Sequence, residues 1–510
     1  MIKRKNKTFV QSLGNILATL TVVSVAACNM SPDYKRPSAS IATEWPIGPA
    51  YGPPPPSGIT MPPQAYNVGW KVFFRDPVLS QLISMSLANN RDLRESIENI
   101  AASRANYIQQ RAEIFPTINA GAGATYQGIP SSVQGVSGGK KVQHFNELQT
   151  GFGISNYELD LFDHVRSLAR AARESYLAQQ ENTISLQISL ISEVANSYMA
   201  WLADMECVRI IHENVVNREN NLRLIQGLRH YGQQNAQAVA QAVELVQQAR
   251  SQEQVYLRTA AADMTNLVLL VGQPIPQEIL QRAGNNPSLN NFVAMPEVSA
   301  GMPSDLLERR PDIRVAEHQI KEANANVGYA RAAFFPSIEL TTSGGTASSR
   351  FAGMFGPYSA LWQFAPSISV PLMDEGKNLA QLRSAKAKLR AAVAHYQKTV
   401  QSAFKDVSDA LAARNTLKEK LIADRTTAKA SEQDYNLSYA RFRNGIDSFL
   451  SALVAQNTML TAQISAVQSH LQYLQSLSTL YRTLGGGWSE DNPTQSSTKE
   501  SASSVVMKRG

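Results

Sequence analysis

The feature that most constrains the fold of this chain is an internal repeat at an offset of 220 residues. Asp92 opens the segment DLRESIENIAASRANYIQQRAEIFPTI and Asp312 opens DIRVAEHQIKEANANVGYARAAFFPSI, with ten of 27 positions identical and no gap. Both copies contain Phe-Pro near their ends, at Phe115 and Phe335. Because proline ends a helix and favours extended geometry in the residue before it, each copy is predicted to be a helix that runs into a strand.

The strand pattern is clearest between Trp362 and Leu372. Apolar residues occupy even positions, and the residues at odd positions up to Ser369 are small or polar. This alternation predicts a strand with one face toward lipid or core and the other toward water. The apolar residues are Trp362, Phe364, Ile368, Val370 and Leu372.

The first copy has a less regular strand pattern. Phe152 and Ile154 alternate in one phase and Tyr157 follows the other, so we expect a bulge or a membrane boundary between them. Loops between paired strands are expected at Gln127–Leu148, which is rich in Gly, Ser and Lys, and at Arg350–Ala360. Each copy is therefore predicted to supply a strand hairpin.

Two very long helices are predicted after the hairpins, over Asp163–Arg229 and Asp374–Arg443, which are free of proline and nearly free of glycine. At about 1.5 Å per residue, each would extend for on the order of 100 Å. Their apolar residues step by four and three, which is coiled-coil spacing. A helical-bundle core would give the same spacing, but the length argues against an ordinary globular bundle. The two stripes are Ile184, Ile188, Ile191, Ala195 and Tyr198, and Tyr396, Val400, Ala403, Val407 and Ala410.

Each long helix is expected to turn and return as a second long helix. The first turn contains Gly232 and Asn235, and the second contains Asn444 and Gly445. Glycine and asparagine tolerate the left-handed backbone of such turns. The second returning helix ends at Leu484-Gly485-Gly486-Gly487-Trp488, a C-cap pattern.

The N-terminus has the pattern of an export signal. Four basic residues precede a 15-residue, mostly apolar run from Leu13 to Ala27, which is too short and too polar to span a membrane as a helix. The run ends in Val25-Ala26-Ala27-Cys28, which resembles a bacterial lipoprotein signal with Cys28 as the lipidated first residue of the mature chain. An ordinary cleavage site beside a chance cysteine is the alternative. Asn29 is not the aspartate that commonly retains lipoproteins in the inner membrane, so we expect an outer-membrane anchor.

Charge and cysteine content exclude several classes of protein. The net charge of +7 includes four basic residues of the signal, so the mature chain carries about +3. So small a charge does not indicate a nucleic-acid-binding protein. With Cys28 lipidated, Cys207 has no disulfide partner, and its apolar helical neighbours indicate a small core side chain. No run of about 20 apolar residues follows the signal, so any membrane crossing must be made by β-strands.

The patterns divide the chain into five segments. Each repeat contains a helix, a strand hairpin and a long helical hairpin. The expected boundaries are 1–27 for the signal peptide, 28–69 for a proline-rich, extended, lipid-anchored tether, 70–290 for the first repeat, 291–488 for the second repeat and 489–510 for a flexible C-terminal tail.

The strands require an oligomer. A transmembrane sheet must close to leave no unpaired edge, and four strands cannot close alone. Two chains would give eight strands, too few for an open lumen, whereas three would give twelve, which leaves room for a channel. The predicted fold is therefore an α+β membrane protein with internal duplication: a trimeric 12-stranded outer-membrane β-barrel, four strands per chain, continued by a long α-helical coiled-coil barrel.

Several motifs together are highly specific. They are Leu307-Glu308-Arg309-Arg310-Pro311-Asp312-Ile313, Ala316-Glu317, Ala323-Asn324-Ala325, Phe334-Phe335-Pro336-Ser337-Ile338, Pro32-Asp33-Tyr34-Lys35-Arg36-Pro37, Tyr157-Glu158-Leu159-Asp160-Leu161-Phe162 and the Leu-Gly-Gly-Gly-Trp ending. Over essentially all of the mature chain, they resemble TolC-like outer membrane efflux proteins, and within that family the lipoprotein branch typified by OprM and NodT.

This resemblance implies a lipid-anchored homotrimer in the cell outer membrane, with a helical barrel in the periplasm. Family members dock to a periplasmic membrane-fusion adaptor and an inner-membrane pump, commonly of the resistance-nodulation-division (RND) type. The implied function is a passive exit duct of a tripartite efflux system for drugs or other small molecules. An outer-membrane duct for type I protein secretion is the alternative, and the lipoprotein signal and the Arg-Pro-Asp-Ile motif favour small-molecule efflux. The turns expected to face the adaptor hold Gly232, Asn235, Asn444 and Gly445.

Family members also narrow at their periplasmic end, near the second helical turn. The residues that match the family pattern are Arg441, Phe442, Gly445 and Leu450. Val454 stands where an aspartate is common, and in the first copy Val239 and Val243 are expected at corresponding places. We therefore predict an apolar periplasmic aperture led by Leu450, which gates by closeness and dewetting rather than by a ring of carboxylates. A bundle-core leucine is the alternative interpretation of Leu450.

Catalysis and adhesion are the other functional classes. The sequence has no H-E-x-x-H, C-x-x-C, G-x-S-x-G or Walker spacing, and none of its seven histidines is paired at metal-ligand spacing. We therefore expect no enzyme activity, no catalytic residue, no metal and no cofactor. An adhesive coiled coil predicts continuous heptads without membrane strands, and the alternation over Trp362–Leu372 argues against it.

Overall fold

The computed structural model describes residues 29–38, 41–51, 64–130, 142–282, 288–293, 295–296 and 298–487. Cys28, Trp488, the expected signal peptide and the expected C-terminal tail lie outside these residues. The chain divides into two compact units. The sheet unit comprises Met1–Pro37, Asn99–Gln179 and Ala316–Tyr396, and the helix unit comprises Ser38–Glu98, Gln180–Val315 and Gln397–Gly510.

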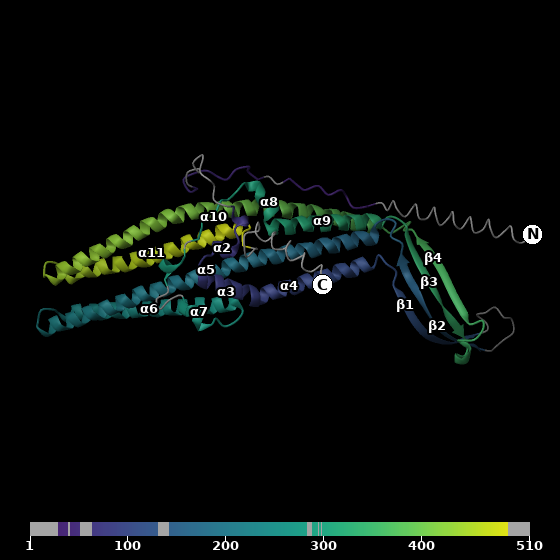
Figure 1. The fold of residues 1–510 in the computed structure, drawn as a ribbon, viewed down its shortest axis with the longest axis horizontal. Coiled ribbons are helices and arrows are strands. Elements are labelled where there is room, and N and C mark those ends of the chain that lie inside the picture. Colours follow the sequence, from purple (N-terminus) through teal and green to yellow (C-terminus); the bar gives the residue numbers. More distant parts are fainter. Residues whose placement is uncertain are drawn as a thin grey trace, which may run out of the picture. The chain divides into compact units, whose positions relative to one another are not determined.

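The order of elements repeats along the chain (Figure 1). A 22-residue helix leads into a strand hairpin, a 67-residue helix and a returning helix, and this order occurs twice. The internal duplication is therefore confirmed. The first copy is α4 (Arg91–Ala112), β1 (Ile118–Pro130), β2 (Val142–Glu158), α5 (His164–His230) and α6 (Ala236–Val271). The second copy is α9 (Pro311–Ala332), β3 (Ser337–Ser348), β4 (Ala360–Ser369), α10 (Lys377–Arg443) and α11 (Phe449–Thr483).

Shorter helices precede the first copy and connect it to the second, and η4 lies between β3 and β4. Asp76 starts one of them, because its Oδ1 accepts hydrogen bonds from the backbone N–H groups of Val78 at 3.0 Å and Leu79 at 2.9 Å. Within the described part of the chain, no helix has the length and apolar content to cross a bilayer. The short elements are η1 (Ala65–Asn67), α2 (Trp70–Phe73), α3 (Pro77–Asn89), α7 (Gln277–Arg282), η2 (Leu289–Asn291), η3 (Pro303–Asp305), α8 (Leu306–Arg309) and η4 (Phe351–Gly353).

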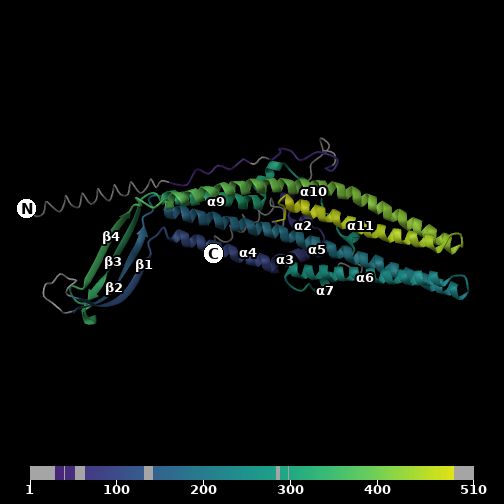
Figure 2. The same cartoon turned by 180° about the vertical axis from the view of Figure 1, so that it is seen from behind.

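The four strands form one antiparallel sheet in chain order, β1-β2-β3-β4 (Figures 1 and 2). The strand registers place even-numbered residues on one face over most of the sheet. On that face, Phe152, Trp362 and Phe364 are 66%, 79% and 62% exposed. The other face carries polar residues such as Gln149 and Gln363 together with several glycines. The predicted division into an apolar and a polar face is thus clearest on β4 and extends to Phe152 of β2.

Two glycines allow β2 and β3 to approach closely. Gly151 pairs with Gly345 on the polar face. A Cβ atom on Gly345 would lie 2.1 Å from the carbonyl oxygen of Thr150, and one on Gly151 would lie 2.5 Å from that of Gly344. Neither position has room for a side chain, which explains glycine at both. Gly121, on the same face, has no atom within 4 Å of such a Cβ.

The irregularity predicted in the first copy is a shift of register between β2 and β3, which falls between Ile154 and Tyr157. Asn156 lies inside it with a φ of 52°, a left-handed conformation that asparagine tolerates. Its backbone N–H donates to the hydroxyl of Thr341 at 3.2 Å. The shift places Tyr157 opposite Leu340, so Tyr157 joins the apolar face.

The strand expected over Trp362–Leu372 ends earlier than predicted. β4 stops at Ser369, so Val370 and Leu372 lie beyond it. Pro371 explains the difference, because proline has no N–H to donate to a strand ladder.

The loop expected over Gln127–Leu148 is shorter than predicted. β1 runs to Pro130 and β2 starts at Val142, with Gln127 paired to Phe145. Glycine, serine and lysine favour a loop by composition, but pairing across the hairpin overrides that local preference.

The predicted helical stripes are mostly buried. Ile184 is half-buried, and every other member of both stripes is at most 5% exposed. In the helix unit, the two views agree that α6 runs beside α5 and α11 beside α10 (Figures 1 and 2). The two stripes are therefore buried faces of α5 and α10, as coiled-coil spacing predicts.

The Leu-Gly-Gly-Gly-Trp ending closes α11 as predicted. Gly485 has a φ of 77° at the helix C-terminus. A Cβ on Gly486 would lie 2.4 Å from the ring of Tyr481. The absence of a side chain at position 486 therefore makes room for that ring. Tyr481 stacks on Phe73 with ring centroids 4.0 Å apart, and its hydroxyl donates to the carbonyl of Val68.

The segment expected as a tether is extended, and its described residues pack against the helices. In the helix unit, Trp45 stacks on Phe404 at 5.1 Å, and its indole N–H donates to the carbonyl of Gly301 at 2.8 Å. Proline prevents helix and sheet formation in this segment, but the side chains of the other residues can still pack against the helices. The segment is therefore more than a spacer.

Candidate functional site

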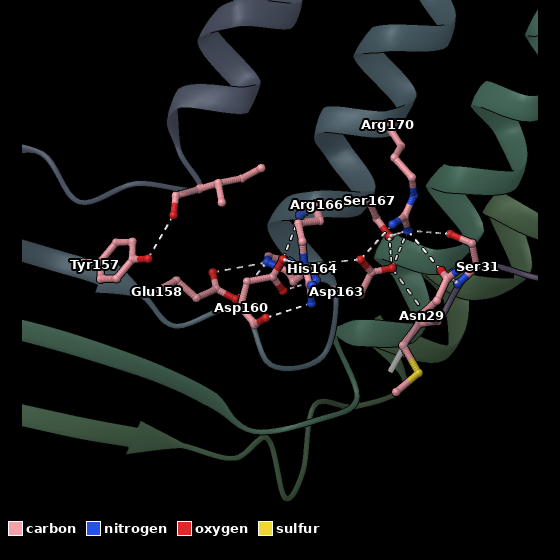
Figure 3. Close-up of polar contacts among 12 residues, drawn as sticks. Asn29, Ser31, Tyr157, Glu158, Asp160, Asp163, His164, Arg166, Ser167 and Arg170 are labelled. Carbon is pink, nitrogen blue, oxygen red and sulfur yellow. Dashed lines mark hydrogen bonds and ion pairs between the residues drawn. The ribbon is translucent and has the colours of Figure 1, made fainter. Parts of the chain in front are cut away.

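The motif Tyr157-Glu158-Leu159-Asp160-Leu161-Phe162 forms the junction between β2 and α5 (Figure 3). The hydroxyl of Tyr157 donates to the carbonyl of Ile114 at 2.9 Å. The carboxylate of Asp160 caps the helix, because it accepts from the backbone N–H groups of His164 at 2.6 Å and Arg166 at 2.8 Å. Asp160 also binds the guanidinium of Arg166 at 3.0 Å. The motif thus fixes the direction in which α5 leaves the sheet.

The first residue of α5 links the two repeats. Nδ1 of His164 lies 3.1 Å from Oε1 of Glu158, and the imidazole stacks on Tyr329 of α9 with centroids 4.6 Å apart. Beside it, Phe162 stacks on Phe335 at 4.9 Å. The hydrogen bond to Glu158 raises the pKa of His164 above its usual value of 6.5.

Asp163, directly before α5, is the most constrained residue of the junction. Its φ is 67°, a left-handed conformation that costs a non-glycine residue roughly 1–2 kcal/mol. Its side chain is 2% exposed. The carboxylate accepts from the hydroxyl of Ser167 at 3.0 Å and from Nη1 of Arg170 at 2.9 Å, and Nη2 of Arg170 donates to its other oxygen (Figure 3). A buried, paired carboxylate therefore holds this strained backbone.

The residues that follow Cys28 bind at this junction; we refer to Asn29–Pro37 as the anchor segment. The backbone N–H of Met30 donates to Asp163 at 3.4 Å. Nη2 of Arg170 donates to Oδ1 of Asn29 at 3.1 Å and to the hydroxyl of Ser31 at 3.0 Å (Figure 3). The Asp163–Arg170 pair therefore contacts three consecutive residues.

Helix α9 binds the anchor segment through backbone carbonyls. Nη1 of Arg331 donates to the carbonyl of Met30 at 3.1 Å, and Nδ2 of Asn324 donates to that of Pro32 at 2.6 Å. The segment thus contacts α5 from the first repeat and α9 from the second.

Glu317 of α9 binds the C-terminal part of the anchor segment, which contains Tyr34 and Arg36. Its carboxylate accepts from Nε of Arg36 at 3.1 Å and pairs with Nζ of Lys321 at 2.9 Å. The same Nζ lies 5.2 Å from the centroid of the Tyr34 ring, a cation–π distance. Burial raises the pKa of Glu317, but hydrogen bonds from Arg36 and Lys321 outweigh it and hold that pKa below the usual 4.5.

Gly328 in α9 leaves room for the anchor segment. A Cβ atom there would lie 2.3 Å from the hydroxyl oxygen and 2.9 Å from the backbone nitrogen of Ser31. It would also lie 2.8 Å from the hydroxyl oxygen of Ser167. Any side chain at position 328 would therefore occupy the space of Ser31.

The two helical turns have the same backbone geometry. Gly232 and Gly445 have φ values of 71° and 70°. In each turn, the N–H of the glycine and that of the next residue donate to carbonyls of the last helical turn at 2.9–3.0 Å. This is the Schellman arrangement, which requires a left-handed residue.

The side chains of the two turns differ. In the first turn, Oδ1 of Asn235 accepts from the N–H of Ala238 at 2.9 Å and starts α6. In the second turn, Nδ2 of Asn444 donates to the carbonyl of Ala440 at 2.8 Å. The second turn also holds an ion pair between Arg441 and Asp447 at 2.6 Å and a contact between the rings of Phe442 and Phe449 at 5.2 Å. The ion pair and the ring contact account for Arg441 and Phe442 in the family pattern.

Leu450 and Val454 are exposed on the first turns of α11, at 64% and 57%. They are four residues apart and so share one face of the helix. Val243 on α6 is 39% exposed, and Val239 is half-buried. The structure therefore places Leu450 and Val454 together on an exposed face of α11, and their role at an aperture stays a prediction.

The correspondence expected between the copies differs from this geometry. When the turns are aligned by Gly232 and Gly445, Leu450 matches Gln237 and Val454 matches Gln241. Val239 and Val243 instead match Ala452 and Gln456, which are both 1% exposed. The first copy thus presents amides at the places where the second presents aliphatic side chains.

Sequence reasoning did not identify Asp163, Arg170 and Gly328. The family motifs contain Arg36, Glu317 and Asn324 of this site, and Gly328 was a further signal, because an isolated glycine is unfavourable inside a helix. Within the described residues, no group of three or more His, Cys, Asp or Glu side chains is placed to hold a metal ion.

Comparison with known proteins identifies the family. The family model for outer membrane efflux proteins matches residues 82–273 and 302–486, one block in each repeat. The chain is 40% identical over 473 residues to the toluene efflux pump outer membrane protein TtgC of Pseudomonas putida, covering 92% of this chain and 95% of the relative. It is 36% identical to the outer membrane protein OprJ of Pseudomonas aeruginosa, covering 93% and 96%.

A solved structure agrees with these relatives. The open state of the MtrE outer membrane channel of Neisseria gonorrhoeae matches with a TM-score of 0.80 and 33% identity, over 91% of this chain and all of that one. The chain therefore belongs to the outer membrane efflux protein family and is the outer-membrane exit duct of an efflux system.

Proposed function

We propose that three copies of this chain close a 12-stranded barrel in the outer membrane and a helical barrel in the periplasm. The observation that carries the proposal is the sheet, in which β1 and β4 form the edges and one face bears exposed Trp362, Phe364 and Ile368. An open sheet in a bilayer leaves unpaired backbone groups at its edges, each of which costs several kcal/mol. Closure by three chains pairs these edges and places the polar, glycine-rich face on the lumen.

The assembly is tested by the behaviour of purified protein in detergent. Light scattering should give the mass of a trimer, and gel migration should change on heating, as it does for transmembrane barrels. A stable monomer with unchanged migration would contradict the proposal.

The duct passes drugs or other small molecules that an inner-membrane pump of the RND type delivers through a periplasmic adaptor, and it performs no catalysis itself. Relatives at 40% identity are named for efflux of toluene and of antibiotics, which supports small molecules over the alternative of type I protein secretion. The adaptor docks at the turns that contain Gly232, Asn235, Asn444 and Gly445. Deletion of the gene should raise susceptibility to drugs and solvents and leave secreted proteins unchanged. Loss of a secreted protein with unchanged susceptibility would favour the alternative.

The chain is anchored by lipid at Cys28, with residues 1–27 removed, 28–69 as the lipid-anchored stretch, 70–290 and 291–488 as the repeats and 489–510 as a tail. Support comes from the neighbouring Asn29 and Met30, which bind the helix that begins at the sheet. Intact mass of the purified protein tests this, because a diacylglycerol and a third acyl chain should be present and should be absent from the Cys28→Ser variant.

Leu450 and Val454 narrow the periplasmic aperture. Their exposure on one face of α11 supports this role. A ring of aliphatic side chains excludes water and ions when it closes. Leu450→Ser should raise the conductance of the purified trimer in a planar bilayer. The matched variant Gln237→Ser, at the equivalent place in the first copy, should have a smaller effect. Unchanged conductance in Leu450→Ser would contradict the assignment.

A further inference from the structure

We infer that a small inorganic anion, with the size and charge of chloride, binds beside Arg218 in the helix unit, where α5 meets α6 and α11. The site consists of Asn214 and Arg218 of α5 together with Gln456 and Asn457 of α11. It involves neither the proposed aperture nor the anchor segment.

Arg218 is a buried cation with neutral partners. The residue is only 6% exposed. Its Nη1 donates to the backbone carbonyl of Leu245 at 2.8 Å, and its Nη2 donates to Oδ1 of Asn457. Burial lowers the pKa of the guanidinium below its usual value, and no neighbouring charge raises that pKa again. Removing an ion from water is strongly unfavourable unless a charge of opposite sign compensates it, so Arg218 requires a counter-charge.

The acidic side chains nearest to Arg218 along the chain do not supply that counter-charge. On α5, Glu213 and Glu219 each pair with a different arginine, at 2.8 Å and 2.7 Å. On α6, Glu244 is exposed. Helix α11 contains no aspartate or glutamate. Within the part of the chain that the structure describes, no carboxylate therefore bonds to Arg218.

Three buried hydrogen-bond donors at the site have no partner: Nε of Arg218, Nδ2 of Asn214 and Nε2 of Gln456. Asn214 precedes Arg218 by one helical turn, and side chains of a helix lean toward its N-terminus, so the stem of Arg218 passes over Asn214. Gln456 directly precedes Asn457, which binds the guanidinium. The donors thus gather at one place.

An anion fits this set of donors better than water does. The unpaired acceptor at the site is Oδ1 of Asn214, so N–H groups are in excess. A water molecule could accept from two of them, but it would leave the charge of Arg218 uncompensated. A chloride ion accepts several N–H bonds and carries the missing negative charge.

The second repeat shows that the fold does not require an arginine at this position. When the turns are aligned by Gly232 and Gly445, Arg218 matches Ser431 of α10. Ser431 is also buried, and its hydroxyl donates to the carbonyl of Ala428 at 2.9 Å. A small hydroxyl that bonds within its own helix thus fills the equivalent place. The buried charge is a property of the first repeat and not of the helical architecture.

The site joins the two helical hairpins. Arg218 links α5 to α6 through Leu245 and to α11 through Asn457. Asn457 is exposed and also lines a polar groove together with Thr427 and Thr458. A small ion therefore has a short route from solvent to the guanidinium. Because the bound ion neutralises a cation that contacts three helices, its binding should stabilise the folded protein.

The test compares thermal unfolding of the purified full-length protein in sodium chloride and in sodium gluconate at equal ionic strength. A ligand that binds only the folded protein raises the unfolding temperature. Chloride should raise it by about 2 °C or more, and bromide should have the same effect. In crystals grown with sodium bromide, anomalous scattering should place a bromide ion against Nε of Arg218 and Nδ2 of Asn214.

Two variants locate the chloride effect. Asn214→Asp supplies the missing counter-charge with nearly the same shape, so it should raise the unfolding temperature in gluconate and abolish the response to chloride. Arg218→Met removes the charge but keeps an unbranched side chain, and it should also abolish the response. Arg209→Met is the matched control, because Arg209 lies on the same helix and is already paired with Glu213. The control should respond to chloride as the parent protein does.

Two results would overturn the inference. Equal unfolding temperatures in chloride and gluconate, with no bromide ion in the crystal, would mean that water or a neighbouring copy of the chain satisfies Arg218. A chloride response that persists in Asn214→Asp and Arg218→Met would mean that the ion binds elsewhere. If Arg218→Met does not fold, Asn214→Asp alone decides, because it adds a partner and removes none of the charges.

Discussion

Arg310 is the residue around which the Arg-Pro-Asp-Ile motif is organised. Its Nε and Nη2 bind the two oxygens of Asp312 at 3.0 Å and 2.7 Å, and its Nη1 donates to the carbonyl of Thr483 at 3.0 Å. The side chain is only 11% exposed. The motif, which the sequence marks as a family pattern, therefore joins the start of α9 to the last residue of α11.

Replacing Arg310 with alanine should destabilise the protein by about 1–3 kcal/mol, because the nearly buried guanidinium is lost and the carbonyl of Thr483 is left without this partner. Thermal unfolding of the purified protein measures the effect. Arg258→Ala, at an exposed position of α6, should change stability by no more than about 0.5 kcal/mol. Equal effects of the two variants would show that the motif acts through charge alone.

His164 should make stability depend on pH. Because its hydrogen bond to Glu158 raises the pKa in the folded state, its contribution is fully present below about pH 6.5 and is lost as pH rises through the folded pKa. The contribution should be less than about 1 kcal/mol, because both side chains are partly exposed. The melting temperature of the parent minus that of His164→Gln should fall between pH 6 and pH 9. Glu158→Gln should abolish the same dependence, and a constant difference would refute this role.

At the scale of elements, the close pairing of β2 with β3 depends on missing side chains. Gly345→Ala should cost about 3 kcal/mol or more, because its Cβ would meet backbone atoms that cannot move aside. Gly121→Ala, on the same face with open space, should change stability by about 0.5 kcal/mol or less. The yield of heat-modifiable trimer compares the two. Normal assembly of Gly345→Ala would show that the strands can separate locally.

The helices and hairpins could be predicted because their signals are local. The repeat sets the order of elements, proline ends the first helices, and the period of apolar residues separates strands from helices. The register shift at Asn156 was also predictable, because the alternation changes phase there. The extent of β1 and β2 was not, since their paired ends have loop-like composition.

Family motifs marked Arg36, Glu317 and Asn324, but their meeting in the anchor-segment site could not be predicted, because its contacts are polar, aperiodic and distant in sequence. Met30 contacts Asp163 and Arg331, which are 133 and 301 residues away. No spacing rule connects such positions. The two helical turns could be located from the sequence, because their glycines are a local signal. The match of Leu450 to Gln237 could not, because it depends on aligning the two turns by Gly232 and Gly445.

At the scale of the whole molecule, a trimer presents six helical turns of two kinds. Arg441→Ala removes the ion pair to Asp447 from three of them. Because we propose that the adaptor binds these turns in their folded conformation, the variant should raise drug susceptibility several-fold. Leu228→Ala, at the equivalent position of the first turn, should have little effect because no ion pair exists there in the described structure. Drug susceptibility of complemented deletion strains measures both. Equal loss with both variants would indicate that the adaptor does not distinguish the turns.

The contacts of the anchor segment with α5 and α9 can form only late during synthesis of the chain. The segment leaves the ribosome first, but Asn324, Gly328 and Arg331 follow about 300 residues later. At typical rates of 5–20 residues per second, roughly 15–60 seconds pass before these residues of α9 have been synthesised. During that interval the proposed lipidation site at Cys28 would stay open to the enzymes that cleave and acylate a lipoprotein signal. Docking then acts as a late step that withdraws a finished N-terminus from those enzymes.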